Sequence, residues 1–137
     1  LAEAEKFLDT VAICPNQLGQ RAALWGMRNL GNWVGEQRSE ILDRRDAITE
    51  GFPALASKGW KLLGCGAYFA YVEHPFDIPS DELAQRLVKD AAILCLPGTM
   101  FMPKGDDSGK RQLRIAFANI DRSGIEELFA RLAALQL

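Results

Sequence analysis

Arg114 is the residue whose type and setting most clearly suggest chemistry. It stands inside an otherwise apolar run, Leu113-Arg114-Ile115-Ala116-Phe117-Ala118. A charge among apolar side chains is costly unless it meets an opposite charge. A guanidinium offers two parallel N–H donors that match the two oxygen atoms of a carboxylate. Arg114 is therefore a candidate for binding a carboxylate. The alternative is an edge-strand arginine that pairs with a local carboxylate or is solvated.

The cysteine and histidine residues do not form a second candidate site. The cysteines lie far apart without CxxC spacing, and His74 is the single histidine, so neither a zinc site nor a nucleophilic thiol is indicated. We expect His74 at the surface, at the end of a strand. The tryptophans have no basic stripe beside them and are expected to pack rather than to stack on bases. Inert core thiols and packing tryptophans are thus expected at Cys14, Cys65, Cys95, Trp25, Trp33 and Trp60.

Length and charge limit the class of protein. The chain has 137 residues, of which 48% are hydrophobic, the usual size of one domain with one core. Its 16 basic and 18 acidic side chains give a net charge of −2 without long runs of one sign, so no nucleic-acid or membrane surface is indicated. No apolar stretch approaches the ~20 residues that span a bilayer. The isolated cysteines fit reduced thiols in the cytoplasm. The first residue, Leu1, fits a fragment.

The first third of the chain predicts helices. Asn16 can cap a helix over residues 17–28. Gly31 and Gly35 predict a break or bend, because each glycine costs about 1 kcal/mol in a helix interior. A strongly charged helix over 33–49 follows, and we expect it to run along the surface and to connect two domains.

The rest of the chain predicts short strands. Aromatic and β-branched residues gather in runs that are separated by glycine. The segment over residues 98–110 is rich in glycine, proline and aspartate, so we expect an exposed and mobile loop there. Strands are expected over residues 60–63, 67–73, 91–97 and 113–118, with a tight turn or a bulge at the glycines of residues 64–66.

Two further helices are expected to cover these strands. Ser80 is expected to cap the first, whose buried stripe is Leu83, Leu87 and Val88. A capping box over residues 123–126 begins the second, whose buried stripe is Ile125, Leu128, Phe129 and Leu132. The order of elements predicts an α+β fold, in which helices cover one face of a small mixed or antiparallel sheet in two layers.

Four segments give the sequence a resemblance to a known family. Residues 11–23, 64–71, 96–101 and 113–119 occur in an order and spacing that resemble the class I and II, fold-type I aminotransferases, enzymes that use pyridoxal phosphate. The resemblance implies a C-terminal part of such an enzyme, with residues 1–33 as the tail of the large cofactor-binding domain and residues 34–137 as the small domain. It implies amino-group transfer between an amino acid and a 2-oxo acid, in a longer homodimeric parent enzyme.

The cofactor is not expected on these residues. In the family a lysine in a short Ser/Thr-rich motif holds pyridoxal phosphate, and the large domain upstream supplies that lysine. No such motif surrounds the six lysines of this chain: Lys6, Lys58, Lys61, Lys89, Lys104 and Lys110. The chain alone is therefore expected to be inactive and to bind no cofactor.

The resemblance also assigns a role to Arg114. In the family, an arginine at the start of this strand binds the substrate α-carboxylate. The segment 66–68 is implied near the substrate cleft, although a glycine bulge with a core Tyr68 explains it as well. Phe101 and the loop after it either close over substrate or form an ordinary connection. Lyases, decarboxylases and regulators share the architecture. The rival hypothesis is a freestanding α+β module that binds or senses a small carboxylate without catalysis.

Overall fold

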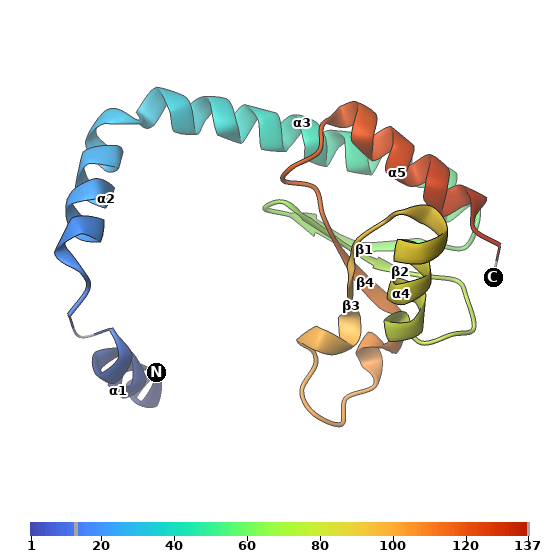
Figure 1. The fold of residues 1–137 in the computed structure, drawn as a ribbon, viewed down its shortest axis with the longest axis horizontal. Helices are drawn as coiled ribbons and strands as arrows, with labels where there is room; N and C mark the ends of the chain where they lie inside the picture. Colours follow the sequence, from blue (N-terminus) through green and yellow to red (C-terminus); the bar gives the residue numbers. More distant parts are fainter. Residues whose placement is uncertain (13, 137) are drawn as a thin grey trace. The chain divides into compact units, whose positions relative to one another are not determined.

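The described part of the chain forms five helices, four short strands and two 3-10 turns. Figure 1 shows their arrangement. The computed structural model describes residues 1–12 and 14–136. Ile13, part of the 11–23 segment, lies outside them. The chain divides into two compact units, Leu1–Arg38 and Ser39–Leu137. In chain order the elements are α1 (Ala2–Val11), α2 (Gln17–Asn29), α3 (Gly31–Ala56), β1 (Lys61–Gly66), β2 (Phe69–Glu73), α4 (Ser80–Ala91), β3 (Leu96–Pro97), η1 (Gly98–Phe101), η2 (Ser108–Arg111), β4 (Gln112–Ala116) and α5 (Arg122–Ala134).

The helices of the first third confirm most of the sequence prediction. The Asn16 side chain caps α2 by accepting a hydrogen bond from the Gly19 amide at 3.0 Å. The break falls at Leu30, the C-cap of α2, and α3 passes through Gly35 without interruption. The expected break near these glycines is therefore confirmed beside Gly31, whereas the helix is not broken at Gly35. A cost of about 1 kcal/mol per glycine is small enough to be overridden by the rest of a long helix.

Helix α3 also continues beyond its expected end at residue 49. It extends through Pro53 to Ala56 because Ile48, Phe52 and Leu55 follow the 3.6-residue period and are buried in the core. Ion pairs then join α3 to α5: Arg122 lies 2.8 Å from Asp43 and 2.7 Å from Glu50.

The four strands form one antiparallel open sheet in the order β1-β2-β4-β3. Of the tight turn or bulge expected over residues 64–66, the structure has a bulge next to Gly64 and no turn at these residues. Gly64 and Gly66 pair with Tyr71 and Phe69 in the ladder, after a bulge between Leu62 and Gly64. The tight turn lies one residue later and includes Ala67, whose φ of 49° is in the left-handed region that two-residue hairpin turns require.

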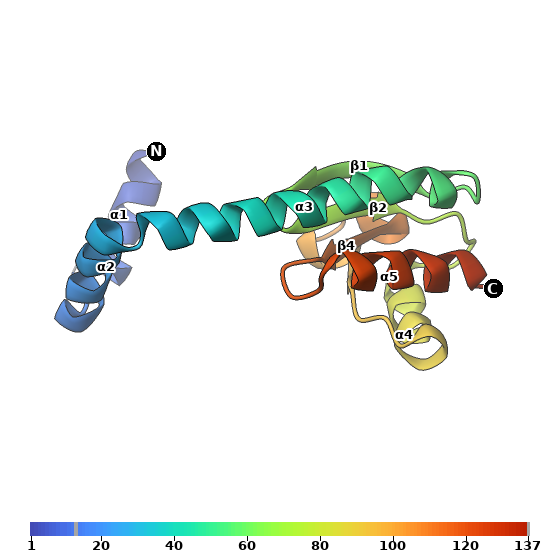
Figure 2. The same ribbon diagram turned by 90° about the horizontal axis from the view of Figure 1, so that it is seen from above.

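Helices cover a single face of this sheet, as expected. Ala70 and Val72 of β2, with Leu113 and Ile115 of β4, are buried in the same core as the inner faces of α3, α4 and α5. Figures 1 and 2 show α5 running alongside the second half of α3 over the sheet. Since side chains alternate along a strand, the residues between these, among them Arg114, point to the uncovered face.

The caps of the last two helices differ from the prediction. Ser80 is the first residue of α4, with Pro79 at the N-cap, and its hydroxyl donates instead to the Gly109 carbonyl oxygen at 3.0 Å. Asp121, not Ser123, caps α5 by accepting from the Gly124 amide at 2.9 Å. The expected stripe of α5 is buried throughout, whereas Val88 of α4 is exposed.

The apolar run over residues 91–97 is mostly not a strand. Helix α4 runs to Ala91, and Ala92 ends it in the left-handed conformation, with φ of 52°. Leu94 is exposed, and only Leu96 and Pro97 pair with β4. The segment over 98–110 is likewise more structured than expected, because η1 and η2 close it at both ends.

Several single residues lie elsewhere than expected. Cys95 is buried, and burial raises the pKa of its thiol to about 12, as an inert core thiol requires. Cys14 is exposed, however, and so are Trp25 and Trp33. His74 is fully buried beside the rings of Trp60 and Phe76 rather than at the surface.

The buried His74 predicts a pH-dependent stability. Burial, and secondarily the charge of Arg111, lower the pKa of His74 below its usual value of 6.5, so the folded chain holds it neutral. Below pH 6.5 the unfolded chain binds a proton that the folded chain does not, and stability is lost as the pH falls, by at most about 1.4 kcal/mol per pH unit. Urea unfolding at pH 7.5, 6.5 and 5.5 should show a steeper loss for the native sequence than for His74→Phe. Equal slopes would contradict this assignment.

The unit Leu1–Arg38 predicts self-association of the chain. None of its residues in α1 or α2 is buried, and many are large and apolar: Phe7, Leu8, Val11, Leu18, Leu24, Trp25 and Met27. Such a surface exceeds what soluble monomers usually expose. Light scattering after gel filtration should give an oligomer for residues 1–137 and a monomer for residues 39–137. A monomeric 1–137 chain at high concentration would disprove the prediction.

None of the described helices is long and apolar enough to cross a membrane.

Candidate functional site

Arg114 lies in the middle of the sheet, on the face that no helix covers. Strand β4 has β2 on one side and β3 on the other, so Arg114 is not on an edge strand. Its register partners are Tyr71 on β2 and Leu96 on β3. The flanking Leu113 and Ile115 point into the core, and Arg114, which is half-buried, points away from it.

Two aromatic rings enclose the Arg114 guanidinium. Its Cζ atom is 4.2 Å from the ring centroid of Phe69 and 4.2 Å from that of Phe101. Phe69 belongs to β2, whereas Phe101 ends η1, directly after β3, so the rings come from the two sides of β4. Both distances are within the ~6 Å that defines a cation–π contact.

The guanidinium has no carboxylate partner among residues 1–12 and 14–136. No acidic oxygen of these residues lies within 4 Å of its nitrogen atoms, whereas Arg44, Arg86, Arg122 and Arg131 each form an ion pair. A local ion pair, one of the two alternatives for Arg114, is therefore excluded for the described residues. A half-buried cation that lacks an anion is suited to receive one from a ligand.

Tyr71, the neighbour of Arg114 across the ladder, adds a second polar group. Its hydroxyl oxygen is buried and has no hydrogen-bond partner within the described part of the chain. Burial raises the pKa of Tyr71, and the charge of Arg114 acts in the opposite direction. The hydroxyl is therefore protonated at neutral pH and able to donate. An unsatisfied buried hydroxyl costs about 1–3 kcal/mol, which a bound ligand or water would recover.

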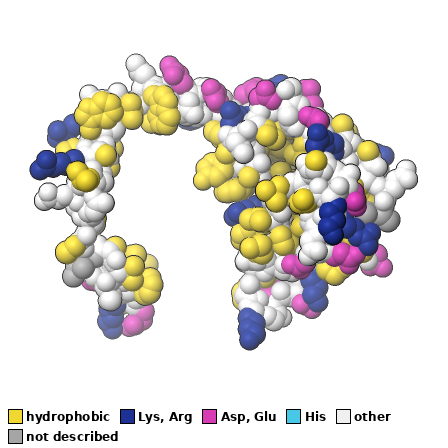
Figure 3. All heavy atoms as spheres, in the orientation of Figure 1, with side chains coloured by type: hydrophobic (Ala, Val, Ile, Leu, Met, Phe, Trp, Pro, Cys, Tyr) yellow, Lys and Arg dark blue, Asp and Glu magenta, His cyan; other side chains and the backbone are white. Residues whose placement is uncertain are grey.

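Apolar side chains surround this face. Tyr68 at the hairpin tip is exposed rather than a core aromatic, and its ring contacts Phe69 at 4.6 Å between centroids. Figure 3 shows hydrophobic side chains on the side of the folded unit that carries the β1–β2 hairpin and η1. The exposed members of this apolar rim are Leu63, Tyr68, Met100 and Phe101.

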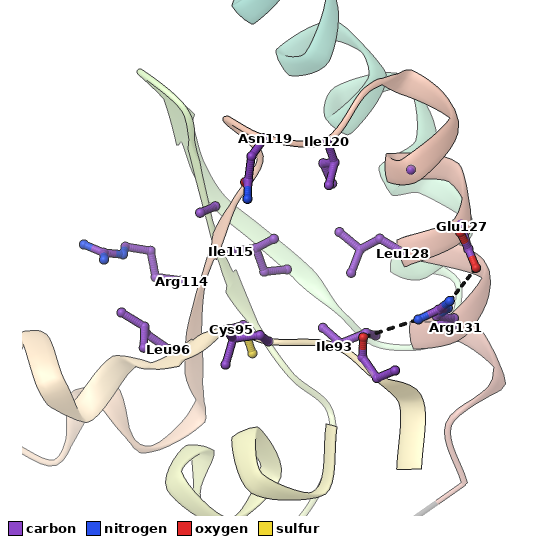
Figure 4. A pocket seen from close by; sticks show the side chains of 14 residues that line it. Ile93, Cys95, Leu96, Arg114, Ile115, Asn119, Ile120, Glu127, Leu128 and Arg131 are labelled. Atoms are coloured by element: carbon purple, nitrogen blue, oxygen red, sulfur yellow. Dashed lines mark hydrogen bonds and ion pairs between the residues drawn. The ribbon is translucent and has the colours of Figure 1, made fainter. Parts of the chain in front are cut away.

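Arg114 also borders a pocket that is separate from its contacts with the two rings. A pocket of about 520 Å³ lies between the end of α4, β4 and α5, and Arg114 is one of its bounding residues. Figure 4 shows Ile115 and Leu128 pointing into it from opposite sides, whereas the Arg114 side chain points away from it. An ion pair between Glu127 and Arg131 closes the far wall. The Arg114 guanidinium therefore lies outside this pocket.

The described residues do not fit a pyridoxal phosphate site. All six lysines are exposed, and those at positions 6, 61 and 110 are paired with acidic side chains. None of the six bounds the cavity beside β4. No cluster of histidine, cysteine and acidic residues among the described residues could hold a metal ion. The Arg114 guanidinium, which has no carboxylate partner among the described residues, is suited to bind an anion.

Sequence reasoning identified Arg114 and missed its surroundings. It considered Phe101 only as part of a closing loop, and it assigned no role to Phe69 or Tyr71. The alternation of Phe69 and Tyr71 along one strand was visible, but nothing local indicated that this strand pairs with the one that carries Arg114.

Comparisons with known proteins give matches over nearly the whole chain. The model of the family "Aminotransferase class I and II" matches residues 3–132. An aromatic aminotransferase of Arabidopsis thaliana is 24% identical over 136 residues, which are 98% of this chain and 32% of that protein.

Solved structures give the same picture. A kynurenine aminotransferase of Pyrococcus horikoshii superposes with a TM-score of 0.75 at 27% identity, over 96% of this chain and 33% of that one. Cystalysin of Treponema denticola, which contains pyridoxal 5'-phosphate, has the same fold with a TM-score of 0.72 at 21% identity, over 93% and 32% of the two chains. The chain thus spans about a third of the length of the relatives it matches.

Proposed function

Because this chain belongs to the aminotransferase class I and II family, whose members use pyridoxal phosphate, we propose that it works as the C-terminal third of such an enzyme and supplies Arg114 as the group that binds the substrate α-carboxylate. We call the polypeptide encoded by the complete reading frame the parent chain. The observation that carries the proposal is the Arg114 guanidinium itself, half-buried between two aromatic rings without a carboxylate partner among the described residues.

The geometry explains how this chain would take part in amino-group transfer. The two rings contact the guanidinium without a nitrogen or oxygen acceptor, so its N–H donors remain available for the two parallel hydrogen bonds that a carboxylate can accept. The Tyr71 hydroxyl is a further donor on the same face. Amino acids and 2-oxo acids, the two substrate types of aminotransferases, share this carboxylate, so one clamp can hold both.

The remaining parts of the proposal concern the parent chain. Residues 1–33 would be the tail of the large domain, which binds the cofactor, and residues 34–137 the small domain. The exposed apolar residues of α1 and α2 support the first assignment, because they need a partner surface. We also propose a homodimeric parent enzyme and a cytoplasmic location, the latter because Cys14, Cys65 and Cys95 are free thiols.

The first test compares two proteins. The parent chain, supplied with pyridoxal phosphate and 2-oxoglutarate, should form glutamate from at least one of L-phenylalanine, L-tyrosine, L-methionine, L-aspartate and L-alanine. Residues 1–137 alone should form none and should show no saturable absorbance from a lysine-bound cofactor, since all six lysines are exposed outside any cofactor site.

Two results would overturn the proposal. One is a reading frame that encodes no lysine-bearing domain upstream of Leu1, which would favour a freestanding carboxylate-binding module. The other is stoichiometric cofactor binding by residues 1–137, abolished by a single lysine substitution.

A further inference from the structure

We propose that Phe101 is a positioning residue that holds the Arg114 guanidinium in the orientation that a carboxylate requires; this inference rests on the proposed function of Arg114. Neither the family match nor the relatives assign a role to Phe101. The two rings near Arg114 are held by different parts of the fold. Phe69 lies in a strand, whereas Phe101 lies in the 3-10 turn η1.

The first ring is fixed by the sheet. Phe69 begins β2 and pairs with Ala116 of β4, two residues after Arg114. The neighbouring Tyr68 carbonyl oxygen accepts a hydrogen bond from the Phe117 amide at 3.0 Å. The ladder therefore sets the position of Phe69 relative to Arg114 without help from any loop.

The second ring is fixed by the contacts of η1. Gly98 and Gly109 touch through their backbones: a Cβ atom on Gly109 would lie 2.6 Å from the Gly98 carbonyl carbon. The Thr99 hydroxyl donates to the Asp81 carboxylate of α4 at 2.7 Å. The Ser80 hydroxyl, at the start of the same helix, holds the Gly109 carbonyl oxygen.

These contacts fix the position of η1 in the fold. They lock both 3-10 turns to the first turn of α4, and Phe101 is the last residue of the locked turn. Phe101 is 40% exposed, so it is not a core residue. Its ring contacts the guanidinium, with Cζ 4.2 Å from the ring centroid.

A guanidinium held on both sides has fewer orientations to lose when a carboxylate binds. Arginine side chains are otherwise among the most mobile, and a flexible clamp must be ordered at the expense of affinity. The cation–π contact adds attraction through the face of the ring, and the Phe101 side chain has no nitrogen or oxygen acceptor that would occupy an N–H donor. Phe101 therefore acts on the substrate through Arg114.

The test uses the parent chain and 3-phenylpropionate, a carboxylate without an amino group, with its Kd measured by calorimetry. Phe101→Leu keeps an apolar side chain but removes the ring, and it should raise Kd about two- to thirtyfold. Phe101→Tyr retains the ring and should stay within about twofold. With an amino acid that the parent chain accepts, Phe101→Leu should raise KM more than it changes kcat.

A double-mutant cycle separates positioning from general structural damage. In the Arg114→Ala background, Phe101→Leu should have no further effect on Kd, because the group it orients is gone. An equal loss in both backgrounds would show that Phe101 is only structural. If Arg114→Ala weakens binding and Phe101→Leu does not, this inference is wrong and the proposed function stands. If neither weakens binding, both fail. If Phe101→Leu lowers the melting temperature, Phe101→Met replaces it in the double-mutant cycle, because methionine also lacks a ring. The same outcomes then support or overturn the inference.

Discussion

Replacing Arg114 with lysine in the parent chain should lower kcat/KM for amino acids about tenfold to a hundredfold. Lysine keeps the charge and loses the planar fork, so one of two parallel hydrogen bonds to the carboxylate disappears. A hydrogen bond to a charged group contributes about 1.5–3 kcal/mol, and each ~1.4 kcal/mol is a factor of ten. The lysine ammonium also lacks the planar guanidinium surface that can stack on the rings of Phe69 and Phe101.

Alanine at the same position should cost more than lysine. It removes both hydrogen bonds and leaves the substrate carboxylate facing an apolar rim. Cofactor occupancy, read from the absorbance of the purified protein, should hardly change in either variant, because Arg114 is proposed to contact the substrate alone. The half-reaction with amines that lack the carboxylate is the internal control and should be equally slow in all three proteins.

Two outcomes would remove Arg114 from the site. One is a lysine variant with undiminished kcat/KM for amino acids. The other is a joint loss of cofactor, stability and activity in both variants, which would identify Arg114 as a residue that the fold requires rather than the substrate.

The position of Arg114 could be predicted because it depends on local pattern. Leu113 and Ile115 flank it on a strand with period two, so a buried face for them implied the opposite face for Arg114. The buried stripe of α5 followed in the same way from the 3.6-residue period. Both inferences need only neighbours in sequence.

The surroundings of Arg114 depend on pairings that no local pattern encodes. Tyr71 is its partner only because β2 and β4 pair in one particular register, and a shift of one residue would turn Tyr71 to the other face. Phe101 reaches it only because Gly98 and Gly109 approach closely enough to fold the intervening loop back. The sequence shows two glycines there and gives no sign that they touch.

The errors in secondary structure have the same origin. The apolar run over 91–97 suits a strand or the end of a helix equally, and the left-handed Ala92 decides between them. Ser80 has the side chain of a good N-cap, but a carbonyl oxygen 29 residues away takes its hydroxyl. His74 precedes a proline, which suggested a surface position, but its ring packs against those of Trp60 and Phe76. Tertiary contacts overrule the local preference in each case.

The close contact between Gly98 and Gly109 predicts that Gly109→Ala destabilises the fold. In Gly109→Ala the new methyl group would lie 2.6–2.7 Å from the Gly98 carbonyl carbon, the Gly98 oxygen and the Thr99 nitrogen, all of them backbone atoms that cannot rotate away. Forcing an extra carbon into such a contact costs about 1–3 kcal/mol, and the turns η1 and η2 must separate. Gly64→Ala is the matched control, since nothing lies within 4 Å of its added methyl group.

Gly109→Ala should also disturb the site, because η1 ends at Phe101, whose ring contacts Arg114. If the turns separate, the Ser80 hydroxyl and the Gly109 carbonyl oxygen no longer meet, and Phe101 moves off the Arg114 guanidinium. Urea unfolding of residues 39–137 should show Gly109→Ala destabilised by about 1–3 kcal/mol and Gly64→Ala unchanged within about 0.5 kcal/mol. In the parent chain, Kd for 3-phenylpropionate should rise at least as much as it does in Phe101→Leu, because the whole turn is displaced. A Gly109→Ala protein as stable as Gly64→Ala, with unchanged Kd, would show that the two turns do not rely on this contact.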